Sequence, residues 1–221
     1  MTMAKKNITL SAEAQAIIDA FVSDNVLNPM SLYNLVGELY SRRENARQDI
    51  ISSVKDLLMS SPLGLSEANL TILEAEYINV LKYCHDALAK IEGLYSDKPF
   101  HLPYEFCDLI SRLIESKKED SVFLPLAGYA EMAFHMDVKS ISGFEFNSWA
   151  WAFDNIFLDA YGINGEIKRQ ETINDDSLEV LLSEQLTGAR YKHVVSFPPH
   201  ISTKEDKHIA KYMQYVLENE V

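Results

Sequence analysis

The sequence of 221 residues lacks several features that define broad classes of protein. Its longest apolar run, residues 122–130, is about half of the roughly 20 residues that a membrane-spanning helix needs, and Pro125 and Gly128 interrupt it. The N-terminus, Met-Thr-Met-Ala-Lys-Lys, turns polar without the apolar core of a signal peptide. Two cysteines, Cys84 and Cys107, do not make a disulfide framework. These absences predict a cytoplasmic protein that has no membrane partner.

Basic residues are also scarce. Lys and Arg number 20 against 33 Asp and Glu, which gives a net charge of -13. Non-specific binding to nucleic acid depends on basic side chains that displace counterions, so any contact with DNA must be local or come from elsewhere. The charge also leaves open an acidic interaction protein, such as a DNA mimic. The 47% of hydrophobic residues is enough for a packed core and excludes a mainly disordered chain.

The first half of the chain has the periodicity of helices, with apolar residues recurring every three or four positions. Ser11 is placed to cap a helix that runs through Val22. A second helix is expected from about Ser31 to Leu57, and a third from Glu67 to Ile91, ended by Gly93. We therefore predict a helical bundle as an N-terminal domain over residues 1–95.

Three arginines, Arg42, Arg43 and Arg47, form the main basic cluster of this half. They could hold phosphates, or they could pair with Glu38 and Glu44 on a solvated face. The second interpretation is favoured because surface ion pairs are common.

The second half alternates short β-rich runs with helical stretches. Such alternation favours an α/β fold in which helices connect the strands of a parallel sheet. We predict a partial Rossmann-like sheet over residues 99–221 with the strand order 3-2-1-4. The expected strands are 122–125, 140–144, 167–170 and 193–196, and the expected helices are 129–136, 147–161, 177–186 and 203–219.

Candidate binding residues follow the predicted strands, because ligands of open parallel sheets bind at the carboxyl ends of the strands. Gly128 follows the first strand and permits a tight turn. Glu145 ends the second strand 17 residues later, near the spacing of a nucleoside-binding unit, and could accept hydrogen bonds from ribose hydroxyls. Pro198 and Pro199 follow the fourth strand, and their rigid backbone could aim carbonyls at an amino group.

The ordered series of segments resembles the adenine-specific DNA methyltransferases of restriction-modification systems, especially the type I modification subunits. Residues 100–106 resemble the segment before the first strand, and residues 122–134 resemble the cofactor loop. Residues 143–152, which read Gly-Phe-Glu-Phe-Asn-Ser-Trp-Ala-Trp-Ala, resemble the acidic loop and its helix. Residues 196–200 resemble the catalytic loop with its double proline.

The resemblance implies methyl transfer from S-adenosylmethionine to the exocyclic amino group of adenine in DNA. It places Gly128 beside the methionine part of the cofactor and Glu145 on the ribose, with Asp175 or Asp176 near the cofactor's adenine. Pro103, Leu126 and Ala127 complete the implied cofactor-binding residues. The implied catalytic residues are Phe197, Pro198, Pro199 and His200, with the Pro198 carbonyl as acceptor for the target amino group. No metal is implied, and the implied partners are DNA, reached through further segments or a specificity subunit, and other restriction-modification subunits.

Two residues of the catalytic loop depart from the family's pattern. Phe197 stands where the family has Asn, Asp or Ser, and phenylalanine cannot accept a hydrogen bond from an amine. His200 stands where an aromatic side chain stacks on the flipped base. These departures keep open a catalytically degenerate methyltransferase fold that acts as a binding or scaffolding subunit. Because only four parallel strands are predicted, we also expect an N-terminal portion of a longer protein or a half that needs a partner.

Overall fold

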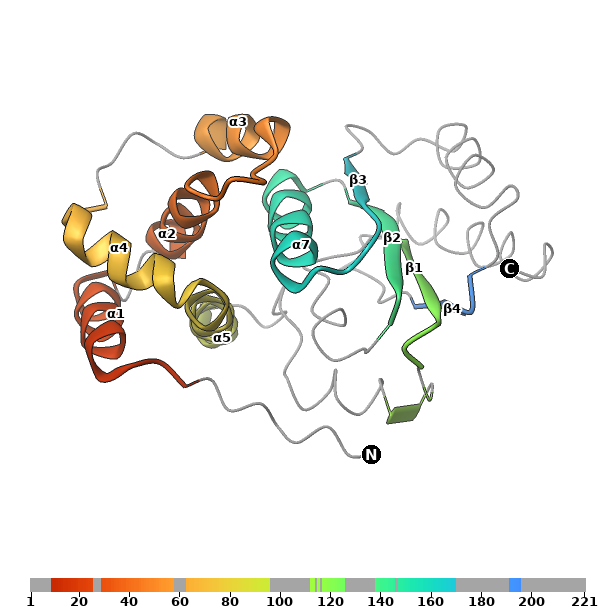
Figure 1. Cartoon of the computed structure of the whole chain (residues 1–221), viewed down its shortest axis with the longest axis horizontal. Helices are drawn as coiled ribbons and strands as arrows, with labels where there is room; N and C mark the ends of the chain where they lie inside the picture. The colour runs from red at the N-terminus through yellow and green to blue at the C-terminus, as the bar shows by residue number, and fades with distance from the viewer. Residues whose placement is uncertain are drawn as a thin grey trace. The chain divides into compact units, whose positions relative to one another are not determined.

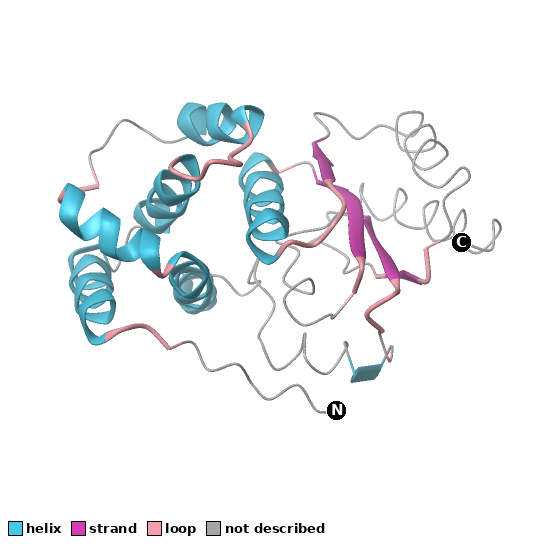
Figure 2. Cartoon of the chain, viewed as in Figure 1, coloured by secondary structure: helices cyan, strands magenta, loops and turns pink. Residues whose placement is uncertain are grey.

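The computed structural model describes residues 9–25, 29–57, 63–95, 112–113, 115, 117–125, 138–145, 147–169 and 191–195. The chain divides into two compact units, residues 1–101 and 102–221, which are described separately below. The first is helical and the second contains a parallel sheet (Figure 2). None of the described helices has the length and apolar character needed to cross a membrane.

The first unit is a helical bundle, as the sequence predicts (Figure 1). Helix α2 contacts each of the other four, and its Leu35, Val36 and Leu39 are fully buried. The Ser11 hydroxyl accepts a hydrogen bond from the Ala14 amide at 3.1 Å, which confirms the predicted cap. The helices are α1 (Ala12–Asn25), α2 (Pro29–Ser41), α3 (Gln48–Leu57), α4 (Glu67–Ala75) and α5 (Tyr77–Tyr95).

The prediction of one helix from Ser31 to Leu57 is wrong, because the chain turns between α2 and α3. The Ser41 hydroxyl donates a hydrogen bond to the Glu38 carbonyl at 2.8 Å, which competes with continuation of the helix. The Tyr40 hydroxyl accepts from the Arg47 amide at 3.0 Å, so a side chain replaces the helical partner of that amide. The apolar periodicity passes through this turn without marking it.

The prediction of one helix from Glu67 to Ile91 is also wrong, because α4 ends before Glu76 and α5 begins after it. Glu76 has φ -112° and ψ 26°, outside the helical region. Its carboxylate accepts a hydrogen bond from the Ser11 amide at 2.8 Å, so a contact with residues 65 positions away accompanies the break. Gly93 does not end α5, which continues to Tyr95.

The second unit contains four parallel strands in the predicted order, β3-β2-β1-β4. Strand β1 lies between β2 and β4, and β3 is the outer strand beside β2 (Figure 1). The bounds agree with the prediction to within two residues. The strands are β1 (Ser121–Pro125), β2 (Ser140–Glu145), β3 (Ile167–Arg169) and β4 (His193–Val194).

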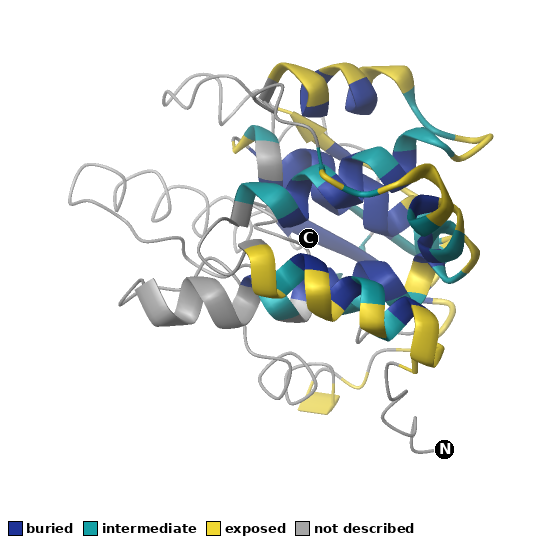
Figure 3. Ribbon diagram, turned by 90° about the vertical axis from the view of Figure 1, so that its left-hand side faces the viewer, coloured by how far each residue is buried: buried dark blue, intermediate teal, exposed yellow. Residues whose placement is uncertain are grey.

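Helix α7 (Ser148–Tyr161) connects β2 to β3 and packs against both. Every residue from Ala150 to Leu158 is at most 6% exposed, so the central part of the helix is buried all round; Figure 3 colours buried residues dark blue. Strands β1 and β2 contribute the buried Phe123 and Phe144, whose ring centroids are 6.1 Å apart. The helices predicted at 129–136, 177–186 and 203–219 lie outside the described residues.

Candidate functional site

The carboxyl ends of the four strands lie at one edge of the sheet, because all pairs are parallel. The last residues of the strands at this edge are Pro125, Glu145, Arg169 and Val194. The chain runs outward from β1 to β2 and β3 on one side, and β4 lies on the other side of β1. This reversal of strand order is the place where open α/β sheets bind their ligands.

Glu145 is the predicted site residue that the structure describes, and it ends β2 at this edge. Its side chain is largely buried, with 8% exposure, and Oε1 accepts a hydrogen bond from the Asn147 amide at 2.8 Å. Asn147 in turn caps α7, because its Oδ1 accepts from the Ala150 amide at 3.2 Å. The carboxylate therefore sits at the N-terminus of a helix, where the helix dipole favours negative charge.

Arg169 is the Cα partner of Glu145 on β3, so a basic and an acidic residue share this register position. Its guanidinium carbon lies 5.9 Å from the centroid of the Trp151 ring on α7, within the range of a cation–π contact. Sequence reasoning missed both residues. The available signal was the position of Arg169 at the end of a predicted strand, next to the acidic strand end.

The other predicted site residues lie outside the described residues. Their placement relative to Glu145 therefore stays a prediction. Two described strand ends lead into the predicted loops: Pro125 immediately precedes Leu126, and Val195 lies two positions before Phe197. The residues concerned are Pro103, Leu126, Ala127, Gly128, Asp175, Asp176, Phe197, Pro198, Pro199 and His200.

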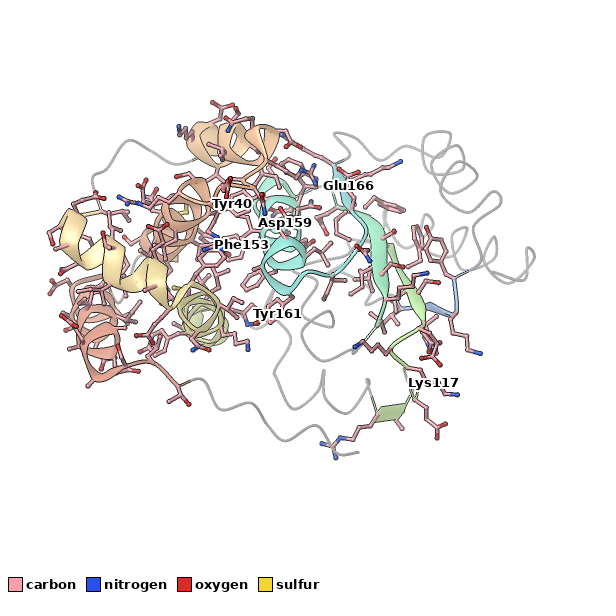
Figure 4. All side chains as sticks on the ribbon, viewed as in Figure 1. Tyr40, Lys117, Phe153, Asp159, Tyr161 and Glu166 are labelled. Carbon is pink, nitrogen blue, oxygen red and sulfur yellow. The ribbon has the colours of Figure 1, made fainter. Side chains whose placement is uncertain are left out.

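An acid–histidine pair lies at the opposite edge of the sheet and was not predicted. Asp120 precedes β1, and its Oδ2 lies 2.8 Å from Nε2 of His193, the first residue of β4. The same oxygen accepts from the backbone amide of Lys117 at 2.9 Å (Lys117 is labelled in Figure 4). The hydrogen bond from His193, followed by that from the Lys117 amide, lowers the pKa of Asp120 below its usual value. The pair joins β4 to β1 at a distance from the candidate binding edge.

The arginine cluster of the first unit makes contacts within that unit. Arg42 pairs with Glu38 at 3.3 Å and with Glu67 at 2.6 Å, and Arg47 pairs with Asp49 at 2.7 Å. Ion pairing is confirmed for Arg42 and Arg47, with Glu38 as the predicted partner and with Glu67 and Asp49 as partners that were not predicted.

The third arginine of the cluster, Arg43, lies over the Tyr77 ring with its guanidinium carbon 4.8 Å from the centroid. Among the residues that the structure describes, no group of three His, Cys, Asp or Glu side chains is arranged to hold a metal ion.

Comparisons with known proteins bear on the fold. No protein-family model matches the sequence, and no curated protein matches it significantly. A solved Listeria monocytogenes protein, assigned as a class I S-adenosylmethionine-dependent methyltransferase, matches 90% of this chain and 62% of its own at 15% identity, with a TM-score of 0.54. A Vibrio vulnificus protein, assigned as the modification subunit of a type I restriction enzyme, matches 89% of this chain and 62% of its own at 12% identity, with a TM-score of 0.54.

These identities are low, so the likeness concerns the fold. The chain has the α/β fold of class I methyltransferases, with a helical N-terminal part, as predicted. It spans about three fifths of the length of the two solved chains.

Proposed function

We propose that this chain is the helical and cofactor-binding portion of a DNA adenine methyltransferase, the modification subunit of a restriction-modification system. The fold and the two structural neighbours support methyl transfer as the class of reaction. The observation that carries the proposal is the buried Glu145 carboxylate at the end of β2, the strand next to β1, on whose other side the strand order reverses. Residues 99–221 form the cofactor-binding domain, and residues 1–95 the helical domain that precedes it.

The environment of Glu145 fits a ribose-binding acid. Oε1 is held by the Asn147 amide, which fixes the carboxylate at the sheet edge. A carboxylate has two oxygens and about four acceptor directions, so it can also accept from a pair of ribose hydroxyls. S-adenosylmethionine, when bound, supplies the methyl group. Gly128, with Leu126 and Ala127, would approach its methionine part, Asp175 or Asp176 its adenine, and Pro103 would border the same site.

The loop after β4 would receive the target base, which has to leave the DNA duplex. The Pro198 carbonyl, on a backbone made rigid by Pro199, would accept a hydrogen bond from the target amino group and orient its lone pair. His200 would stack on the base. With a net charge of -13, the chain needs other segments or a specificity subunit for most of the DNA backbone contacts.

Phe197 favours a second candidate, a methyltransferase fold that binds or scaffolds without catalysis. It supplies no acceptor beside the target amine, and loss of one hydrogen bond aimed at a transition state costs about 100- to 1000-fold in rate. We expect weak or no methyl incorporation into adenine-containing duplex DNA by the wild-type protein and a gain in Phe197→Asn. Robust wild-type turnover that collapses in Phe197→Asn would contradict this assignment of the loop.

The test of the cofactor site is calorimetric binding of S-adenosylmethionine by the whole protein that carries this chain. Glu145→Gln keeps an oxygen for the Asn147 amide but removes the charge, and we expect it to weaken binding by about 1–3 kcal/mol. The matched control is Glu166→Gln, an exposed residue that directly precedes β3 and is labelled in Figure 4. Equal affinities of wild type and Glu145→Gln would remove Glu145 from the site.

A further inference from the structure

The outer strand β3 has backbone groups that face away from its neighbour. In the described residues β3 pairs with β2, and the Gly143 amide donates to the Glu166 carbonyl at 3.2 Å. Because successive residues of a strand direct their backbone groups to opposite sides, Ile167 directs its N–H and C=O away from β2. When such groups of an outer strand are buried, they need hydrogen-bond partners other than a neighbouring strand.

The side chain of Asn155 on α7 supplies both partners. Its Oδ1 accepts from the Ile167 amide at 3.1 Å, and its Nδ2 donates to the Ile167 carbonyl at 2.8 Å. One side-chain amide thus makes the two hydrogen bonds that a residue of a further strand would make. Asn155 is 1% exposed and Ile167 is fully buried, so water does not substitute for these bonds without an opening of the fold.

The same amide also reaches the first turns of α7. Nδ2 donates a second hydrogen bond to the Trp151 carbonyl at 2.9 Å. Trp151 is the residue whose ring lies against the Arg169 guanidinium, and Arg169 ends β3 as the Cα partner of Glu145. Asn155 therefore connects Ile167, the first residue of β3, with the turn of α7 that carries Trp151. The Trp151 ring in turn lies against Arg169, the last residue of β3.

We propose that Asn155 is a positioning residue of the cofactor site, which fixes β3 against α7 by standing in for a further strand. Through Ile167 it sets the position of Arg169, the Cα partner of Glu145. The functional part rests on the proposed function, whereas the fixing of β3 does not. Asn155 makes no contact with the cofactor in this proposal and acts only through the strand.

The experiment compares Asn155→Leu, which removes all three hydrogen bonds at similar volume, with Ile156→Ala as a matched control. Ile156 is fully buried on the same helix, and its side chain cannot hydrogen-bond to β3. Two readouts are taken on the whole protein: hydrogen exchange of the β3 amides, and calorimetric affinity for S-adenosylmethionine. Urea unfolding measures the free energy of unfolding lost in each variant, so that exchange and affinity in the two variants are compared with the stability of each one known.

We expect the amide of Ile167, which Asn155 bonds, and the amide of Lys168, which faces β2, to exchange faster in Asn155→Leu, while the β1 amides change no more than in Ile156→Ala. Cofactor affinity should fall by about tenfold or more in Asn155→Leu, as for loss of buried hydrogen bonds. In Ile156→Ala it should stay within about twofold, because that substitution removes none of the hydrogen bonds that hold Ile167.

Unchanged exchange at Ile167, or equal losses of affinity in the two variants, would overturn the proposal. If Asn155→Leu does not fold, Asn155→Asp carries the test. Its carboxylate keeps the acceptor for the Ile167 amide but offers no donor to the Trp151 and Ile167 carbonyls. The Ile167 amide should therefore stay protected, while the Lys168 amide exchanges faster and cofactor affinity falls. Absence of cofactor binding by the wild type would reject the proposed function, and the exchange result would still decide whether Asn155 fixes β3.

Discussion

Gly143 is the residue of β2 at which a single methyl group should be most costly. It pairs with Leu124 on β1 and with Ile167 on β3, in the middle of the sheet. A Cβ atom at this position would lie 2.1 Å from the Leu124 carbonyl oxygen and 2.9 Å from its carbonyl carbon. Both are backbone atoms of a paired strand, so no side-chain rotation relieves the contact. Gly143→Ala therefore forces β1 and β2 apart.

The size of the effect follows from that distance. Real Cβ atoms essentially never come within 3.0 Å of another heavy atom, so the strands must separate locally by about 1 Å. Overpacking of a core costs about 1–3 kcal/mol, and we expect the upper end, about 3 kcal/mol, because backbone has to move. For a chain of this length that corresponds to a fall in melting temperature of about 6–12 °C.

The assay is urea unfolding followed by tryptophan fluorescence, since the sequence's two tryptophans, Trp149 and Trp151, both lie in α7 of the same unit. Gly162→Ala is the matched control, because Gly162 has φ 63° and, apart from its chain neighbours, no heavy atom of the described residues lies within 4 Å of the added Cβ. In that variant the loss of stability comes only from placing alanine in the left-handed backbone conformation, which costs about 1–2 kcal/mol. A loss of stability in Gly143→Ala equal to or smaller than that in Gly162→Ala would refute the close approach of β1 and β2.

Two further predictions concern titratable groups. The pKa of Asp120 is lowered by His193 and by the Lys117 amide, so its contribution to stability is fully present above the unfolded pKa of about 4 and is lost as the pH falls through the lower folded pKa. The difference in free energy of unfolding between wild type and Asp120→Asn should therefore shrink below about pH 4. Glu119→Gln, at an exposed neighbouring residue, is the control. A difference that stays constant with pH, or an equal pH dependence in Glu119→Gln, would contradict the pairing of Asp120 with His193. Burial raises the pKa of the Cys84 thiol to about 12, so iodoacetamide at pH 8 should label this thiol only after the protein unfolds. Peptide mass spectrometry measures the labelling. Rapid labelling of the native protein would count against the burial of Cys84.

The sheet was predictable because its strands have a local signal. Strands of a parallel sheet are buried on both faces and appear as short, nearly continuous apolar runs, as in Val122 to Leu124. Helical stretches between the runs require crossover connections and therefore parallel pairing. The order 3-2-1-4 then followed from taking the alternation of strands and helices as a Rossmann-like sheet, and Glu145 lies at the end of β2 as predicted.

The helix breaks were not predictable from periodicity. Apolar positions such as Leu70, Leu73, Tyr77 and Leu81 keep helical spacing on both sides of Glu76, although that residue leaves the helical conformation. The contact that accompanies the break is a hydrogen bond to Ser11, and local sequence carries no record of a partner so far along the chain.

Asn155 shows why part of the site was also beyond sequence reasoning. An asparagine inside a helix is commonly solvated or bonded to its own backbone, and nothing in the local sequence distinguishes those uses from a structural one. Its role depends on the direction in which Ile167 points its backbone groups, which the register between β2 and β3 determines. A shift of that register by one residue would turn the Ile167 groups toward β2 and leave the Asn155 amide without them. The role of Asn155 at the outer strand can therefore be recognised only from the folded sheet, whereas Glu145 can be predicted from its position at the end of an apolar run in the sequence.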